Sequence, residues 1–252
     1  MKAKKIGFVM AMCAIFSVTT LRVLAQDDKK KVAIVTFFVN KQIGLGDGNA
    51  QLASRVTDLA DNPKFNLQPV LDTFYSKFFH NFAQKFPFEL MPEDYVIKNP
   101  TYKAYDTSSV GIVVLISGRE LNPQGYKTIY PGGFLQKSEN RNQNKLLEVF
   151  PEADGVMFVW MDYEFVPKKG FAGMGTCGMK ATINMWLYNK EAKKVFRISE
   201  YATSKKQVAM VGGIPVTAFD KVLPMCEDAS ERLLVELEDK LDKISRKVDA
   251  KL

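Results

Sequence analysis

The sequence predicts an α/β (α+β) protein: a mixed β-sheet with helices packed on it, ending in an antiparallel hairpin and a long amphipathic helix. Three observations support this fold class. Residues 32–39 and 155–161 are apolar runs with the length and β-branched or aromatic content of buried strands. Residues 179–203 alternate on both sides of a turn, as a hairpin does. Residues 68–85 and 234–248 carry apolar side chains at steps of three and four, as amphipathic helices do.

The composition is that of an ordinary globular protein, with 46% hydrophobic and 25% charged residues among 252. It excludes a largely disordered chain, a collagen-like repeat and a disulfide-dense mini-protein. The formal net charge is +7, but four of the 35 basic residues lie in the first 25 positions, where no acid occurs. The remaining 31 basic residues face 28 acidic ones, which gives no reason to expect nucleic acid as a partner.

The first 25 residues have the pattern of a signal peptide. A basic start at 1–5 precedes an apolar stretch at 6–18, and Ala25 ends a run of small or aliphatic residues suited to cleavage before Gln26. No later window reaches the ~18 apolar residues of a spanning helix. We therefore expect a signal peptide at 1–25 and a single α/β domain at 26–252, periplasmic or secreted and without a transmembrane segment after cleavage.

Export changes what the cysteines after the leader can do. Cys177 and Cys226 form an even pair, which in an oxidising compartment predicts one disulfide. The alternative is two buried free thiols. A third hypothesis joins them with Met174, Met179 and Met225 in a Cu(I) site, because Cu(I) favours thiolate and thioether sulfur.

The first predicted strand, 32–39, leads into a glycine cluster at 44–48 and a predicted helix at 49–59. Strand, glycine loop and helix invite a nucleotide-binding interpretation, but the spacing fails. A dinucleotide fingerprint would need its third glycine at Asn49, and no Gly-Lys-Ser/Thr sequence occurs. A tight turn or flexible loop is the preferred interpretation.

The predicted helix at 68–85 buries an aromatic face, and residues 88–91 follow it as a short strand. His80, the only histidine, lies in this helix. A single histidine excludes every His-pair metal motif and restricts any His-dependent triad to this residue. His80 is interpreted as a partly exposed helix residue.

Tyrosines gather in the middle of the chain. Residues 110–116 are either a further buried strand or part of a helix, and their β-branched side chains favour the strand. Residues 122–133 are predicted as a long ordered loop rich in proline and glycine. Such a loop can present rings to a sugar or peptide; the alternative is that the rings pack over the edge of the domain. The candidate ligand-binding residues are Tyr102, Tyr105, Tyr126 and Tyr130.

A short helix ending at 144–150 precedes the strand 155–161, whose continuation alternates. This places Asp162 and Glu164 on one face with their side chains about 7 Å apart. Two carboxylates at that spacing suit a metal pair or the acid and base of glycoside hydrolysis. The alternative is the solvated end of a strand.

The C-terminal third is predicted as a mobile glycine-methionine segment at 170–179, the hairpin at 179–203 with a turn at 189–193, and a final helix. The helix is expected after Pro224, with Asp228 or Ser230 as its N-cap. Its apolar stripe, which we expect to dock on the parent domain, consists of Leu234, Leu237, Leu241, Ile244 and Val248.

Four segments, 31–39, 78–91, 153–159 and 181–203, resemble the exported α/β domains of the CsgG-like curli-secretion lipoproteins and of the N-terminal half of TolB. The resemblance implies an envelope protein without catalysis, working through protein contacts or assembly. Two features depart from it: the acylated cysteine of the secretion lipoproteins has no counterpart, and the glycine-methionine segment and tyrosine loop lie outside the pattern.

The sequence therefore predicts an exported, non-enzymatic envelope protein that binds an envelope protein partner or assembles with itself, without a cofactor or metal. A second hypothesis is a small-ligand or glycan-binding module that uses the tyrosine loop. A third is an exported hydrolase that uses Asp162 and Glu164.

Overall fold

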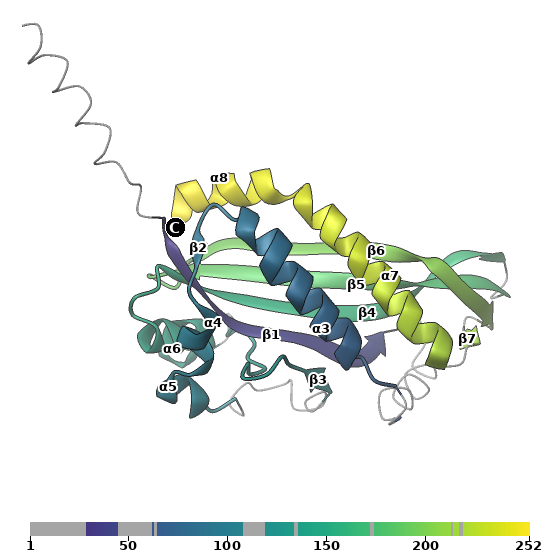
Figure 1. The fold of residues 1–252 in the computed structure, drawn as a ribbon, viewed down its shortest axis with the longest axis horizontal. Coiled ribbons are helices and arrows are strands. Elements are labelled where there is room, and N and C mark those ends of the chain that lie inside the picture. Colours follow the sequence, from purple (N-terminus) through teal and green to yellow (C-terminus); the bar gives the residue numbers. More distant parts are fainter. Residues whose placement is uncertain are drawn as a thin grey trace, which may run out of the picture.

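A single mixed sheet joins all the strands that the structure describes (Figure 1). Its order is β2-β1-β4-β5-β6-β7, and β3 pairs with β1 beside this path. This confirms the predicted fold class. The structure is a computed structural model that describes residues 29–44, 62, 65–107, 119–133, 136–171, 174–212, 214–216 and 219–252.

The strand β1 (Lys31–Gly44) is buried on both faces and has parallel neighbours. It pairs in parallel with β2 (Glu89–Leu90) and β4 (Gly155–Phe171), and antiparallel with β3 (Glu120–Leu121). Burial of both faces explains why this strand reads as a continuous apolar run. The strands predicted at 32–39 and 88–91 are thus confirmed, and β1 continues five residues further than predicted.

The rest of the sheet is antiparallel. Strand β4 pairs with β5 (Met174–Asn189), β5 with β6 (Lys194–Val211), and β6 with β7 (Ile214–Val216). The predicted hairpin at 179–203 is confirmed, with its turn after Asn189.

The glycine-methionine segment was predicted as a mobile loop, and this is wrong: the described part of it is paired strand. A Cβ on Gly175 would lie 2.5 Å from the Cα of Gly170 on the facing strand. A Cβ on Gly170 would lie 2.3 Å from the carbonyl oxygen of Met174. The glycines therefore serve close strand approach, a use that composition alone does not distinguish from loop flexibility.

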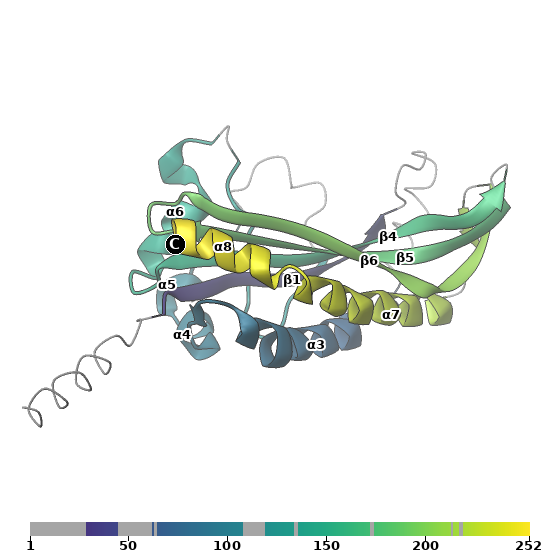
Figure 2. The same cartoon turned by 90° about the horizontal axis from the view of Figure 1, so that it is seen from above.

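One face of the sheet, called here the helix face, is covered by two helical segments (Figures 1 and 2). The first runs through α3 (Gln68–Lys77), the π-helical turn η1 (Phe78–Phe82) and the 3-10 turn η2 (Ala83–Lys85). The second comprises α7 (Phe219–Glu238) and α8 (Leu241–Lys251). The predicted helix at 68–85 is confirmed, and its buried aromatic residues are Phe74, Phe78 and Phe82.

The final helix is docked as predicted, but its start is not where the sequence placed it. It begins at Phe219, keeps Pro224 inside α7, and breaks into α8 before Leu241. The proposed caps make other bonds. The Asp228 carboxylate accepts from two backbone N–H groups of β6, and the Ser230 hydroxyl donates to the Cys226 carbonyl. Of the described helices, none is both long and apolar enough to cross a bilayer.

The described residues cover the opposite face mainly near β1, the first half of β4 and the second half of β5 (Figure 2). Three short helices contribute to a second core: α4 (Glu93–Ile97) with Val96, α5 (Pro100–Lys103) with Tyr102, and α6 (Asn142–Val149) with Leu146. The helix α6 confirms the short helix predicted to end at 144–150. The turn η4 (Ser138–Asn140) leads into α6. This partial cover leaves room for a pocket further along the same face.

Cys177 of β5 and Cys226 of α7 both lie in the core beneath the helix face, and both are free thiols. The predicted disulfide is therefore not formed in the structure. Burial raises the pKa of the Cys177 thiol to about 11, so it packs as a small neutral side chain at neutral pH. The predicted Cu(I) set is not assembled, because Met174 is exposed on β5 while the two cysteines are buried.

Several predicted segments fall outside the described residues: the signal peptide with its Ala25–Gln26 cleavage site, most of the glycine cluster, the helix at 49–59 and the strand at 110–116. These remain predictions.

Two neighbouring residues of α7 offer a matched test of helix docking. Leu237 is fully buried, whereas Val235 is 68% exposed. Leu237→Ala should lower the free energy of unfolding by about 2–5 kcal/mol, because it removes packed methyl groups and leaves a cavity. Val235→Ala should change it by less than about 0.5 kcal/mol. Urea denaturation measures both, and equal effects would contradict the docking of this helix.

Candidate functional site

An open pocket of about 460 Å³ lies on the opposite face of the sheet, where β1, β4 and β5 run side by side. We call it the sheet pocket. Asp162 and Glu164 both line it, which confirms the prediction that they share a face. The intervening Tyr163 is buried toward the helix face, where its hydroxyl bonds to Ser230. The residues that line the sheet pocket are Asn40, Gln42, Gly44, Asp162, Tyr163, Glu164, Lys180 and Thr182.

The register of β4 and β5 determines which groups meet in the pocket. Asp162 lies opposite Thr182, and Glu164 lies opposite Lys180. Gly44 at the end of β1 lies opposite Glu164, and a Cβ there would stand 3.2 Å from the Glu164 Cβ. The absent side chain at Gly44 therefore keeps this side of the pocket open.

Asp162 is half-buried and surrounded by hydrogen-bond donors. The Asn184 amide donates to its Oδ2 over 3.3 Å, and side-chain donors of Asn40 and Trp160 also bond to it. Burial nevertheless raises the pKa of Asp162 to about 6, and the nearby charge of Glu164 adds to the rise. The side chain is thus mostly ionised at neutral pH and gains a proton just below it.

Glu164 is held differently, because its carboxylate forms an ion pair with Lys180. Both side chains are only about a quarter exposed, at 28% and 27%. The Lys180 ammonium also lies 5.1 Å from the ring centroid of Tyr201. The two carboxylates of the pocket therefore differ: Glu164 has a fixed cation beside it, and Asp162 has neutral donors.

An aromatic row, defined as Phe38, Tyr130, Trp160 and Trp186, lies beside these polar groups. Phe38 and Trp160 stack with ring centroids 6.3 Å apart and planes 9° apart. Tyr130 meets Phe38 edge-on at 5.1 Å, and Trp186 lies 5.4 Å from Trp160. Tyr130, Trp160 and Trp186 are half-buried, so each presents part of its ring at the surface.

Two buried polar atoms at this site have no hydrogen-bond partner within the described part of the chain: the indole N–H of Trp186 and the Oε1 of Gln42. The centroid of the Trp186 ring lies 4.5 Å from the Arg197 guanidinium and 4.7 Å from the Lys194 ammonium. Unpaired buried polar atoms are costly and uncommon in folded proteins. One donor and one acceptor at the site thus have unused hydrogen-bonding capacity.

The four candidate tyrosines do not converge on one surface. Tyr102 is fully buried, and its hydroxyl donates to the Val35 carbonyl over 2.8 Å. Tyr126 is buried in the other core and bonds to Glu93. The Tyr105 hydroxyl donates to Asn142. Their contacts fasten the loop 122–133 to the sheet, and only Tyr130 reaches the aromatic row.

The sequence interpretation missed Trp160, Trp186, Lys180, Thr182 and Asn184 as site residues. The signal was present in the strict alternation of β5. Pairing β5 with β4 in the correct register would have placed the polar side chains of β5 beside Asp162 and Glu164.

Other candidate sites in the sequence gain no support. The described residues contain no group of three or more His, Cys, Asp or Glu side chains placed to hold a metal ion. His80 is exposed on η1. Its Nδ1 lies 2.8 Å from the Ser76 carbonyl oxygen, so its ring bonds to the preceding turn of its own helix. Of the glycine cluster, only Gly44 is described, as the last residue of β1.

No protein-family model and no curated protein sequence matches this chain. Two solved structures share a partial likeness of fold. The hypothetical protein CT253 from Chlamydia trachomatis is 10% identical with a TM-score of 0.39, over 86% of this chain and 98% of that one. A homolog of the neuraminyllactose-binding hemagglutinin from Helicobacter pylori is 10% identical with a TM-score of 0.40, over 88% and 89%. Values this low carry no argument about function, and the resemblance to CsgG-like and TolB domains remains a prediction.

The raised pKa of Asp162 predicts that stability depends on pH. The folded-state pKa, about 6, lies above the ordinary aspartate value of 3.8, so ionisation opposes folding and stability falls as pH rises through this window. Asp162→Asn removes the charge and keeps an acceptor. It should raise the free energy of unfolding by about 2 kcal/mol at pH 8 and change it little at pH 4. Chemical denaturation at both pH values, with Glu236→Gln on α7 as control, measures this; a loss of stability at pH 8 would contradict it.

Proposed function

We propose that the protein is an exported binding protein of the cell envelope and that the sheet pocket takes a carbohydrate ligand. The observation that carries the proposal is the juxtaposition of half-buried aromatic rings with carboxylate, amide, hydroxyl and ammonium groups along one face of a rigid sheet. Export is supported by the signal-peptide pattern of residues 1–25, and an envelope role without catalysis by the CsgG-like and TolB resemblance.

The two kinds of group match the two surfaces of a sugar ring. A pyranose has faces of C–H groups, which pack on aromatic rings, and edges of hydroxyls, which both donate and accept hydrogen bonds. Tyr130 and Trp160 supply the rings. Asp162 accepts, Lys180 donates, and the unpaired Gln42 Oε1 accepts. The pocket volume, about 460 Å³, lies in the range of about 300–1,000 Å³ typical of ligand sites.

A second candidate is the exported hydrolase that uses Asp162 and Glu164. It is favoured by the difference between the two carboxyl groups, because Asp162 has a raised pKa, as a glycosidase acid does, and Glu164 has an ion-pair partner instead. Against it, the Glu164 carboxylate would have to attack the sugar or activate a water molecule, and it is already engaged in the ion pair with Lys180. The same contact suits binding, because it fixes the orientation of both side chains.

Intrinsic fluorescence provides a direct assay, because the only two tryptophans of the chain are Trp160 and Trp186. Titration with a panel of acidic, amino and neutral oligosaccharides should shift or quench this emission for at least one class. Asp162→Asn and Lys180→Met should each weaken that binding at least tenfold, because each removes a charged hydrogen-bonding group. The affinity should also fall as pH is lowered through about 6, where Asp162 gains a proton.

Glu236→Gln, an exposed carboxylate change on α7, is the matched control and should bind as the unmodified chain does. Emission that is unchanged by every saccharide, or binding that is indifferent to both pocket substitutions, would overturn the proposal. Release of new reducing ends from a bound oligosaccharide would establish the hydrolase instead.

A further inference from the structure

The strands β4, β5 and β6 extend beyond the helices and end in a protruding tip (Figures 1 and 2). Four large apolar side chains are exposed there, at 89% for Phe171, 64% for Met174, 52% for Val211 and 57% for Val216. We call these four residues the hairpin tip. Exposed apolar side chains gathered in one place mark an interaction surface more often than single scattered ones do.

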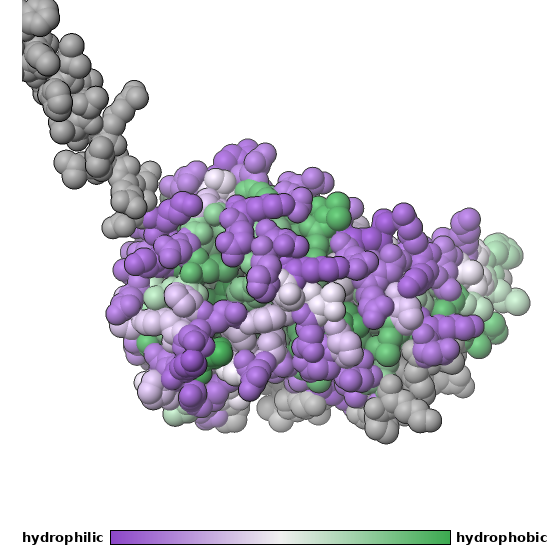
Figure 3. Space-filling view, in the orientation of Figure 1, coloured by the Kyte–Doolittle hydropathy of each residue, from purple (hydrophilic) through white to green (hydrophobic). Residues whose placement is uncertain are grey.

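Strand register brings these residues together. Phe171 pairs with Met174 at the end of β4 and β5. The next residue, Gly175, pairs with Met210, which directly precedes Val211 on β6, and Val216 pairs with Ala209. Figure 3 shows hydrophobic residues at this end of the molecule, with hydrophilic residues behind them.

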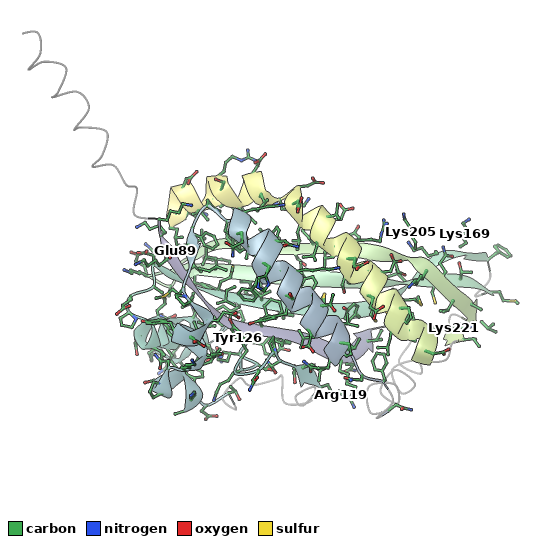
Figure 4. All side chains as sticks on the ribbon, viewed as in Figure 1. Glu89, Arg119, Tyr126, Lys169, Lys205 and Lys221 are labelled. Carbon is green, nitrogen blue, oxygen red and sulfur yellow. The ribbon has the colours of Figure 1, made fainter. Side chains whose placement is uncertain are left out.

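A lysine collar stands behind the hairpin tip and consists of Lys168, Lys169, Lys205, Lys206 and Lys221, all exposed. Figure 4 shows Lys169, Lys205 and Lys221 at this end of the molecule. In the part of the chain that the structure describes, none of the five forms an ion pair. Three acids lie nearby on α7, Asp220, Glu227 and Asp228, and Asp228 is bonded to the backbone N–H groups of Lys205 and Lys206.

The order of these groups along the strand matches the layers of a membrane surface. Lys168 precedes Phe171 by three residues, or about 10 Å of strand. Apolar side chains that insert about 5–10 Å reach the boundary of headgroups and acyl chains, and ammonium groups set back by that distance lie at the level of lipid phosphates. Long lysine side chains can adjust to that level.

The shape of the tip disfavours a folded protein partner. A stable protein interface needs about 20–30 residues on each side, and the hairpin tip offers four large apolar side chains on a convex end. A convex apolar end with a basic collar needs a deformable, apolar and anionic counterpart. A bilayer that contains anionic lipid supplies all three properties.

We propose that the hairpin tip and the lysine collar form a docking site for an anionic lipid surface, with Phe171 and Met174 inserted between the headgroups. This site is separate from the sheet pocket and does not depend on it. Docking through the tip attaches the protein peripherally.

The test uses the full chain in which Trp160 and Trp186 are replaced by phenylalanine, so that a tryptophan introduced at the tip is the only one in the chain. Phe171→Trp is mixed with vesicles that contain brominated phosphatidylglycerol, and Val235→Trp, exposed on α7, is the matched control. The leader contains no tryptophan, so tip quenching is measured even if the leader binds lipid. We expect quenching of Phe171→Trp at least threefold greater than that of Val235→Trp, with little quenching by brominated phosphatidylcholine vesicles.

Lys168→Gln and Lys169→Gln should each weaken binding to the anionic vesicles about fivefold, whereas Lys251→Gln at the far end of α8 should not. The proposal is overturned if the two tryptophan variants are quenched equally, or if anionic and neutral vesicles quench Phe171→Trp alike. It is also overturned if Phe171→Trp is unquenched while Phe171→Ser with Met174→Ser abolishes co-purification of a defined protein, which would make the tip a protein-docking surface.

Discussion

The alternation of β4 is the constraint on which the rest of the structure depends. This 17-residue strand lies between the parallel strand β1 and the antiparallel strand β5, so its register is set on both sides. Met161, Tyr163 and Phe165 face the helices, while Trp160, Asp162 and Glu164 lie on the opposite face, where the two carboxylates line the pocket. A slip of one residue would exchange the two sets, burying carboxylates beneath the helices. The burial of apolar side chains beneath the helices therefore also determines which polar side chains lie on the other face.

The sheet pocket costs the protein stability. Burial opposes the charge of Asp162, and the Oε1 of Gln42, which lines the same pocket, is unpaired among the described residues. A fold selected for stability alone would place apolar residues or a fully paired network here. A ligand that donates to Asp162 and bonds to Gln42 would offset both costs, and this compensation is the physical reason to regard the pocket as a binding site.

The sequence was informative where periodicity and burial coincide, and less so where they do not. The apolar run of β1, the phenylalanine stripe of α3 and η1, and the β5–β6 hairpin were predictable, because each follows a single rule of spacing. Asp162 and Glu164 were predictable as a pair by the same rule, but their partners Lys180 and Asn184 required the cross-strand register. Gly170, Gly175 and Pro224 misled, because tertiary packing places them inside regular elements despite their preference for loops. The tyrosines did not identify the site, because a tyrosine ring can either contact a ligand or pack in a core.

The most direct test of this account is the pH titration of the two indole N–H signals in a ¹⁵N-labelled sample. Trp160 bonds to Asp162, whereas the Trp186 indole N–H has no partner within the described residues. The Trp160 signal, assigned by Trp160→Phe, should move with a midpoint near pH 6 and should stop moving in Asp162→Asn. A Trp160 signal that stays fixed between pH 5 and 7 would contradict the placement of a partly buried, ionisable Asp162 beside the aromatic row.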